Sequence, residues 1–269
     1  MSEQKPHDRV DVIDAEDAMN PLLVFLDRVE QRADYEARRR RSYELLGLRA
    51  GSRVADIGCG AGTAVREMAS LVAPGGAASG VDVNGLLIEC AIRRATRAGV
   101  EATFHVGAVD ALPFADASLD AYRAERLYQH LPKPAEAFAE ARRVLAPGGR
   151  IVLIDQDWDA LLLDSEDLAT TRSVVRGFCD GIVNGTIGRQ YHRLLQSAGF
   201  TDVAVHADTH LSTSFDDYGY FAELLAQSAE GSGRLSGPLA EKWLAEQRER
   251  GKAGRFCMVM THFLATGRR

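Results

Sequence analysis

A glycine-rich loop with a leading carboxylate carries the clearest chemical signal of the chain. The segment Asp56-Ile57-Gly58-Cys59-Gly60-Ala61-Gly62 follows an apolar run and precedes a helical pattern. Glycines at such a turn let the backbone bend sharply and approach a ligand without a side-chain clash. A dinucleotide fingerprint needs glycine at position 63, where Thr63 stands, and a P-loop needs Gly-Lys-Ser/Thr, which is absent. The loop therefore predicts a ligand-binding turn that is neither a dinucleotide fingerprint nor a P-loop.

Two further carboxylates follow the next two apolar runs. Asp82 ends the run Gly80-Val81-Asp82, and Asp110 comes shortly after the run that ends at Val106. Ligands of open α/β sheets bind at the carboxyl ends of the strands. A carboxylate in the position of Asp82 can accept hydrogen bonds from both ribose hydroxyls, and one in the position of Asp110 suits an adenine amine. The alternatives are a solvated strand end and a turn-capping aspartate.

Two other groups of side chains could take part in chemistry. His130 could act as a general base because its pKa lies near neutrality, although a packing or cofactor-side role is favoured. Asp155, Asp157 and Asp159 alternate along the chain and could bind Mg²⁺. Such a site needs further oxygen ligands that the sequence does not place, so no metal is expected.

The elements that position these residues alternate between strands and helices from residue 53 onward. This βαβα order requires a parallel sheet covered by helices on both faces. The predicted strands are 53–57, 77–83, 101–106, 119–124, 150–155, 201–207 and 256–265. The predicted helices are 63–72, 86–98, 135–145, 164–184, 188–198, 216–229 and 238–250, after two N-terminal helices within 15–47.

The composition argues against several classes of protein. The chain has 269 residues and a formal net charge of −6, which does not favour a nucleic-acid partner. No two of its four cysteines form a C-x-x-C pair, so neither a zinc site nor a disulfide framework is expected. We expect no membrane span and no signal peptide, and a cytoplasmic location.

The glycine loop, Asp82, Asp110 and the turn Ala146-Pro147-Gly148-Gly149 occur in an order and at spacings that resemble class I S-adenosylmethionine (SAM)-dependent methyltransferases. The D-x-G-C-G-x-G loop is similar to the ubiquinone/menaquinone-biosynthesis-like branch, of the methyltransferase domain 11/25 type. The resemblance implies an α/β, Rossmann-like fold. Its seven-stranded sheet is mostly parallel, with an antiparallel last strand that 256–265 could supply.

The resemblance also implies that SAM is the cofactor and S-adenosylhomocysteine the product, and it implies which residues hold SAM. The loop backbone would lie against methionine, Asp82 would hold the ribose and Asp110 would face adenine. The residues after the fourth strand would border the methyl group, with His130 as the candidate base. Tyr35 and Arg39 share a helical stripe and would cover the cofactor's carboxylate. The predicted cofactor-binding residues are Tyr35, Arg39, Gly58, Gly60, Ala61, Asp82, Val83, Asp110, Ala111 and Arg126.

Segments outside the sheet are expected to cover the substrate. Residues 1–47 form a predicted N-terminal helical lid, and 48–269 form the methyltransferase domain with lid insertions at about 156–187 and 208–252. The resemblance implies methyl transfer to an oxygen, nitrogen or carbon atom. The aromatic content of these segments indicates a small apolar or aromatic acceptor, such as a secondary metabolite or a quinone. The alternative is an isomerisation or cyclisation of a natural product on the same fold. The oligomeric state is left open, with a homodimer as one option.

Overall fold

The structure, a computed structural model, describes residues 20–269, so the first 19 residues of the predicted N-terminal lid lie outside it. Its centre is one sheet in the order β3-β2-β1-β4-β5-β8-β6, with β7 paired to β8. The strands are β1 (Arg53–Ile57), β2 (Ala77–Asp82), β3 (Thr103–Val106), β4 (Leu119–Glu125), β5 (Leu145–Gln156), β6 (Leu162–Leu163), β7 (Thr201–Ser212) and β8 (Met258–Arg268).

Strand directions confirm the mostly parallel sheet with an antiparallel last strand. β1 to β5 pair in parallel, whereas β8 runs antiparallel to β5, β6 and β7. The sheet has eight strands rather than the predicted seven because two-residue β6 is counted separately. β5 pairs with the part of β8 from His262 to Arg268, and β6 pairs with Met258 and Val259 of β8. β6 therefore continues the pairing of β5 along β8.

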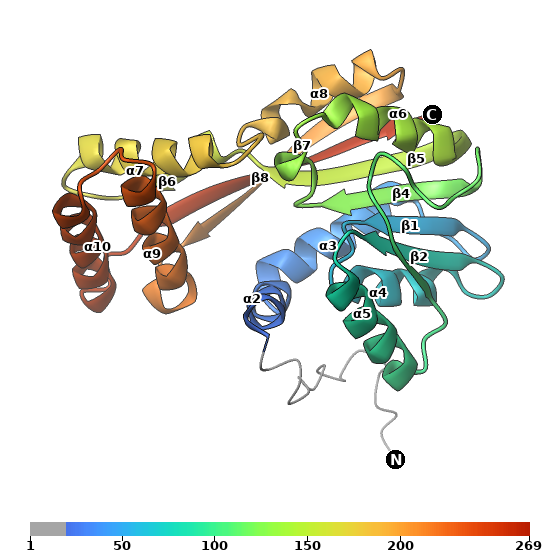
Figure 1. The fold of residues 1–269 in the computed structure, drawn as a ribbon, viewed down its shortest axis with the longest axis horizontal. Coiled ribbons are helices and arrows are strands. Elements are labelled where there is room, and N and C mark those ends of the chain that lie inside the picture. The colour runs from blue at the N-terminus through green and yellow to red at the C-terminus, as the bar shows by residue number, and fades with distance from the viewer. Residues whose placement is uncertain (1–19) are drawn as a thin grey trace.

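Helices cover both faces of the sheet, as the chain order predicted. α3, α4 and α5 lie on one face, and α6 and α8 lie on the other (Figure 1). α4, α5, α6 and α8 each bury apolar side chains spaced three or four residues apart, such as Val65, Met68 and Val72 of α4. The helices are α2 (Pro21–Glu30), α3 (Ala33–Leu46), α4 (Thr63–Val72), α5 (Gly85–Ala98), α6 (Pro134–Val144), α7 (Leu168–Gly181), α8 (Ile187–Ser197), α9 (Phe215–Gly231) and α10 (Gly237–Lys252).

The N-terminal helices begin and dock through identifiable contacts. Asn20 caps α2 by accepting from the backbone N–H of Leu22 at 3.0 Å, with Pro21 in the first turn, as the sequence indicated. Asp27 of α2 then forms a buried bidentate ion pair with Arg94 of α5, with distances of 2.6 and 2.8 Å. This pair fixes α2 beside the glycine loop.

A second helical unit stands at the far end of β7 and β8. Its helices α7, α9 and α10 lie beyond the main sheet (Figure 1) and share an apolar core that includes Trp158, Phe221 and Trp243. α7 begins at Leu168 rather than at the predicted 164, because the Asp167 side chain caps it by accepting from the N–H of Thr170 at 2.9 Å. None of the helices within residues 20–269 has the length and apolar character that a membrane crossing requires.

Candidate active site at the strand ends

The glycine loop lies at the carboxyl end of β1, held against β2. The backbone N–H groups of Gly58 and Cys59 both donate to the carbonyl oxygen of Val81, at 2.8 and 3.1 Å. Gly58 has φ of +74°, and a Cβ atom there would lie 3.2 Å from the Leu127 side chain. A left-handed backbone and this close approach both require glycine. The loop thus presents bare backbone to the space above the sheet.

Asp82 joins the loop to the end of β2. Its Oδ2 accepts from the backbone N–H of Gly60 at 3.0 Å, and its Oδ1 accepts from the N–H of Asn84 at 2.9 Å. A carboxylate oxygen can accept more than one hydrogen bond, so each oxygen keeps a free acceptor position. Asp82 therefore combines a structural role with the capacity to bind hydroxyl groups.

A cavity of about 510 Å³ opens over this edge of the sheet and is called the strand-end cavity below. Its walls contain Gly58, Asp82, Val83, Asp110 and His130. The two carboxylates, 28 positions apart in the sequence, thus face the same space. Val83, with 72% of its surface exposed, forms part of the rim. This volume is in the range of small-molecule sites.

A smaller cavity of about 60 Å³ lies on the other side of Gly58 and is called the glycine-loop cavity. Positively and negatively charged side chains from α2, α3, β1 and β4 line it. They include Tyr35, Arg39, Gly60 and Arg126 of the predicted set. Gly58 belongs to both cavities, so an elongated ligand that crosses it reaches both.

Ala61 and Ala111 line neither cavity. Ala61 is fully buried, and its carbonyl oxygen accepts from Arg66 Nη1 at 2.9 Å. The backbone N–H of Ala111 donates to the carbonyl oxygen of Ala108 at 3.2 Å, which closes the turn that carries Asp110. Both residues shape the loops beside the cavities.

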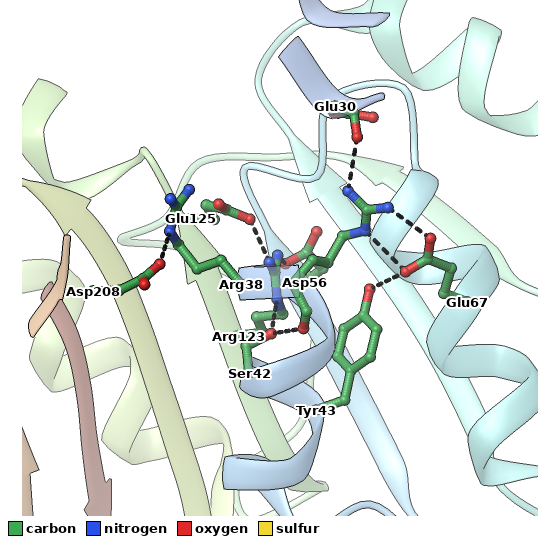
Figure 2. Close-up of polar contacts among 10 residues, drawn as sticks. Glu30, Arg38, Ser42, Tyr43, Asp56, Glu67, Arg123, Glu125 and Asp208 are labelled. Carbon is green, nitrogen blue, oxygen red and sulfur yellow. Dashed lines mark hydrogen bonds and ion pairs between the residues drawn. The ribbon is translucent and has the colours of Figure 1, made fainter. Parts of the chain in front are cut away.

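Arg39 is held by groups of the protein itself. Its Nε and Nη2 atoms donate to Glu67 at 2.9 and 2.8 Å, and Nη1 donates to the Glu30 carbonyl oxygen at 3.3 Å (Figure 2). Tyr43 also donates to Glu67, at 2.8 Å. The Arg39 guanidinium keeps further N–H groups for a ligand, but Glu67 already balances its charge.

A buried ionic network that the sequence reasoning missed lies beneath the glycine-loop cavity. Arg123 Nη1 donates to Asp56 at 2.8 Å, Nε donates to the Ser42 hydroxyl at 2.8 Å, and Nη2 pairs with Glu125 (Figure 2). Burial raises the pKa of Asp56 to about 6 against the opposing effect of Arg123. The signal available was the charged stretch Arg123-Ala124-Glu125-Arg126 at the end of an otherwise apolar strand.

Glu125 presents an unpaired acceptor next to this network. Burial acts to raise the pKa of its carboxyl, but Arg123, Arg126 and Arg38 outweigh it and hold the pKa below its usual value. Its Oε1 atom is buried and has no hydrogen-bond partner. An ionised carboxylate with an unused oxygen at a cavity wall can bind a cationic group.

His130 lies at the wall of the strand-end cavity in a fixed tautomer. Trp158 Nε1, which can only donate, bonds to Gln129 Oε1 at 2.6 Å, so Gln129 Nε2 faces His130 Nε2 at 3.1 Å as a donor. His130 therefore accepts at Nε2 and carries its proton on Nδ1. Burial and the cation of Arg126 lower the pKa of His130. A base role would require the Gln129 contact to break.

The carboxylates of Asp155, Asp157 and Asp159 do not converge. Asp155 is buried and accepts from the Tyr128 N–H at 3.2 Å and from the Tyr191 hydroxyl. Asp157 and Asp159 both pair with Arg189. Within residues 20–269 no group of three or more His, Cys, Asp or Glu side chains could hold a metal ion.

Comparisons with known proteins agree with this arrangement. Residues 55–153 match the family model described as a methyltransferase domain. Over these residues the chain is similar to that methyltransferase family. The matched range includes the glycine loop, Asp82, Asp110 and His130.

Relatives extend the similarity beyond that range. The chain is 38% identical over 207 residues to an uncharacterized 37.1 kDa protein in transposon TN4556 of Streptomyces fradiae, covering 75% of this chain and 59% of the relative. It is 34% identical over 158 residues to the 27-O-demethylrifamycin SV methyltransferase of Amycolatopsis mediterranei, covering 58% of this chain and 56% of that enzyme. The chain thus spans little more than half the length of these relatives.

Solved structures show the same fold. The crystal structure of the [4+2]-cyclase SpnF superposes with a TM-score of 0.55 at 21% identity, covering 87% of this chain and 80% of that one. At this level of identity the likeness concerns the fold alone.

Proposed function

We propose that this chain is a SAM-dependent methyltransferase that acts on a small organic molecule. One observation carries the proposal most directly. Gly58 connects a cavity that contains Asp82 and Asp110 with a second cavity lined by charges of both signs. A ligand with a nucleoside at one end and an amino acid at the other matches that division.

The nucleoside half fits the strand-end cavity. Asp82 has free acceptor positions for the ribose hydroxyls, since each of its two oxygens accepts from a single backbone N–H group. Asp110 lines the same cavity and is exposed, so its carboxylate is available to the adenine amine. Val83 would pack at the rim, and Ala61 and Ala111 would contribute through the loops that they shape.

The methionine half fits the glycine-loop cavity. The unpaired Glu125 oxygen suits an ammonium group, and the remaining N–H groups of Arg39 suit a carboxylate, with Tyr35 beside them. Bare backbone at Gly58 and Gly60 allows close approach between these ends. Arg126 lies where the chain from β4 would border the methyl group.

The fold supplies positioning more than acid–base chemistry. When bound, SAM supplies an electrophilic methyl group on a sulfonium. Aligning the acceptor and excluding water are then the main tasks of the protein. His130 stays our candidate catalytic residue, although its proton-accepting nitrogen is engaged by Gln129.

An aromatic wall supports a small apolar or aromatic acceptor. Phe25 of α2 contacts Tyr220 of α9 with ring centroids 6.1 Å apart, and the contacts continue to Phe221 and Trp158 at 6.4 and 5.5 Å. Arg28 of α2 lies 4.6 Å above the Tyr220 ring. We propose that α2 and the helical unit act together as the lid predicted from the sequence.

Two measurements test the proposal. Isothermal titration calorimetry should detect binding of SAM and S-adenosylhomocysteine, and its failure would refute the cofactor assignment. Transfer of labelled methyl groups to a panel of phenols, enols and amines should release one S-adenosylhomocysteine per product. Turnover of a panel compound without that release would instead favour an isomerisation or cyclisation, an activity that this fold could also host.

A further inference from the structure

Unpaired buried polar atoms gather in one part of the molecule. Eight buried side-chain nitrogen or oxygen atoms within residues 20–269 have no hydrogen-bond partner. Six of these eight atoms belong to five residues that we call the unpaired cluster: Arg38, Glu125, Arg126, Gln156 and His262. Buried polar groups normally have partners, so such a concentration indicates missing ligand groups, and the Glu125 oxygen is already assigned above to the ammonium group of the cofactor.

The cluster surrounds the ring of Tyr35. The guanidinium carbons of Arg38 and Arg126 lie 4.7 and 5.4 Å from the ring centroid. The His262 ring meets Tyr35 edge-on at 5.6 Å, and His262 contacts Gln156 at 2.9 Å. One aromatic ring therefore fixes the positions of two cations and a histidine from α3, β8 and the end of β4.

Arg38 is buried with two of its nitrogen atoms unused. Its side chain has 0% exposure, and Nε donates to Asp208 at 2.8 Å (Figure 2). Asp34 forms an ion pair with Nη2 at 3.7 Å, a distance too long for a hydrogen bond. Neither Nη1 nor Nη2 has a hydrogen-bond partner, and leaving such donors buried is costly. Arg38 lines neither of the two cavities assigned to the cofactor.

Arg126 holds its guanidinium in place at a conformational cost. Its φ is +54°, in the left-handed region that a non-glycine residue rarely adopts. Its side chain makes no hydrogen bond or ion pair within the described part of the chain, and it lines the glycine-loop cavity. Strain of this kind is concentrated at functional sites.

His262 adds no charge to the cluster. Burial, followed by Arg38 and Arg126, lowers the pKa of His262 well below its usual value, so the ring is neutral. Arg38 Nη1 and Nη2 and Arg126 Nε therefore supply the donors without hydrogen-bond partners, and the guanidinium carbons of both arginines lie close to the Tyr35 ring. A planar guanidinium with two free N–H positions matches a carboxylate or another oxyanion best.

We propose that Arg38 and Arg126 bind an anionic oxygen group of the methyl acceptor, either a carboxylate or an ionised hydroxyl. The proposal rests on the proposed function and assigns Arg126 to the acceptor instead of the cofactor. The aromatic wall that begins at Phe25 and Tyr220 receives the apolar body of the same molecule. The substrate class is thus an aromatic or apolar compound with one oxyanion.

The test measures binding of simple probes to protein saturated with S-adenosylhomocysteine. Benzoate represents a carboxylate, 4-nitrophenolate represents an ionised hydroxyl, and benzamide is a neutral analogue of similar shape. Calorimetry should show that at least one anion binds about tenfold or more tightly than benzamide. The visible absorbance of 4-nitrophenol reports separately whether binding favours its ionised form.

Matched variants on the same helix give the control. Arg38→Gln should weaken binding of the anion about tenfold or more, whereas Arg40→Gln, at a position whose side chain is 63% exposed, should not. Affinity for S-adenosylhomocysteine should be unchanged in both. Arg126→Gln provides a second test on another element if Arg38→Gln does not fold.

Three results would overturn the proposal. Equal affinity for benzoate, nitrophenolate and benzamide would show that charge is not recognised. No anion binding to the wild-type protein at millimolar concentration, or undiminished binding in both Arg38→Gln and Arg126→Gln, would count equally against it. If the wild-type protein did not bind S-adenosylhomocysteine at all, that result would instead refute the proposed function.

Discussion

Asp82 Oδ2 accepts a hydrogen bond from the backbone N–H of Gly60 at 3.0 Å. The side chain that we assign to the ribose therefore also fixes the glycine loop to the end of β2. Binding of the nucleoside and the shape of the loop depend on the same carboxylate. A substitution at this position should affect both properties together.

Asp82→Ala removes the carboxylate that accepts hydrogen bonds from the N–H groups of Gly60 and Asn84. It also removes the proposed acceptor for the ribose hydroxyls. We expect the free energy of unfolding to fall by about 1–3 kcal/mol and the affinity for S-adenosylhomocysteine to fall at least about tenfold. Urea unfolding and calorimetry measure the two effects. Asp202→Ala is the control for cofactor affinity, since the Asp202 side chain is 73% exposed. Unchanged cofactor affinity in Asp82→Ala would contradict the ribose assignment.

Gly58→Ala tests the junction between the two cavities. The new Cβ atom would meet Leu127 at 3.2 Å in a backbone with φ of +74°. Gly99 has a similar φ of +65° with nothing within 4 Å, so Gly99→Ala carries the backbone cost alone. We expect both variants to lose about 1 kcal/mol of stability and only Gly58→Ala to lose cofactor affinity. Equal affinities in the two variants would exclude a ligand across Gly58.

Asp27→Ala tests whether α2 must be docked. Removing one partner of the buried Asp27–Arg94 pair should cost about 3–5 kcal/mol because it leaves the Arg94 charge buried. Hydrogen exchange should rise first in α2, whose Leu26 and Glu30 line the glycine-loop cavity. Cofactor affinity should fall with it. Arg40→Gln on neighbouring α3 is the control, and equal exchange in α2 of both variants would argue against the docking role.

The sequence predicted the elements that local chemistry determines. Asn20-Pro21 predicts the start of a helix because an Asn side chain caps the first turn and proline fits within it. The strand–glycine–helix order around Gly58 requires a parallel sheet. The convergence of Asp82 and Asp110 on one cavity could also be anticipated, because both follow strands whose carboxyl ends meet at one edge.

The remaining features depend on long-range pairing. Nothing local to Arg38 distinguishes it from Arg40 in the four-arginine run, yet one is buried against Tyr35 and the other is exposed. The Arg123 network joins three elements, so its partners could not be read from spacing. β6 forms because β8 extends beyond the residues that pair with β5. Only the register of the complete sheet determines how far it extends.

Arg126 adds to the effect of burial in keeping His130 unprotonated. Burial, followed by the Arg126 cation, lowers the pKa of His130 from its usual 6.5, so the folded protein binds this proton less readily than the unfolded chain. Stability from this group is therefore present above pH 6.5 and is lost as the pH falls below that value. Arg126→Gln should raise the pKa of His130 and reduce that acid sensitivity, because it removes the cation that opposes protonation of the ring.

Nuclear magnetic resonance of the imidazole protons measures this shift, with His130→Asn identifying the resonance. Nitrogen chemical shifts should also show the neutral ring protonated at Nδ1, because Gln129 donates to Nε2. Arg40→Gln should leave the titration unchanged. If Arg126→Gln also left it unchanged, the Arg126 guanidinium would not face His130, and its place between cofactor and acceptor would have to be abandoned.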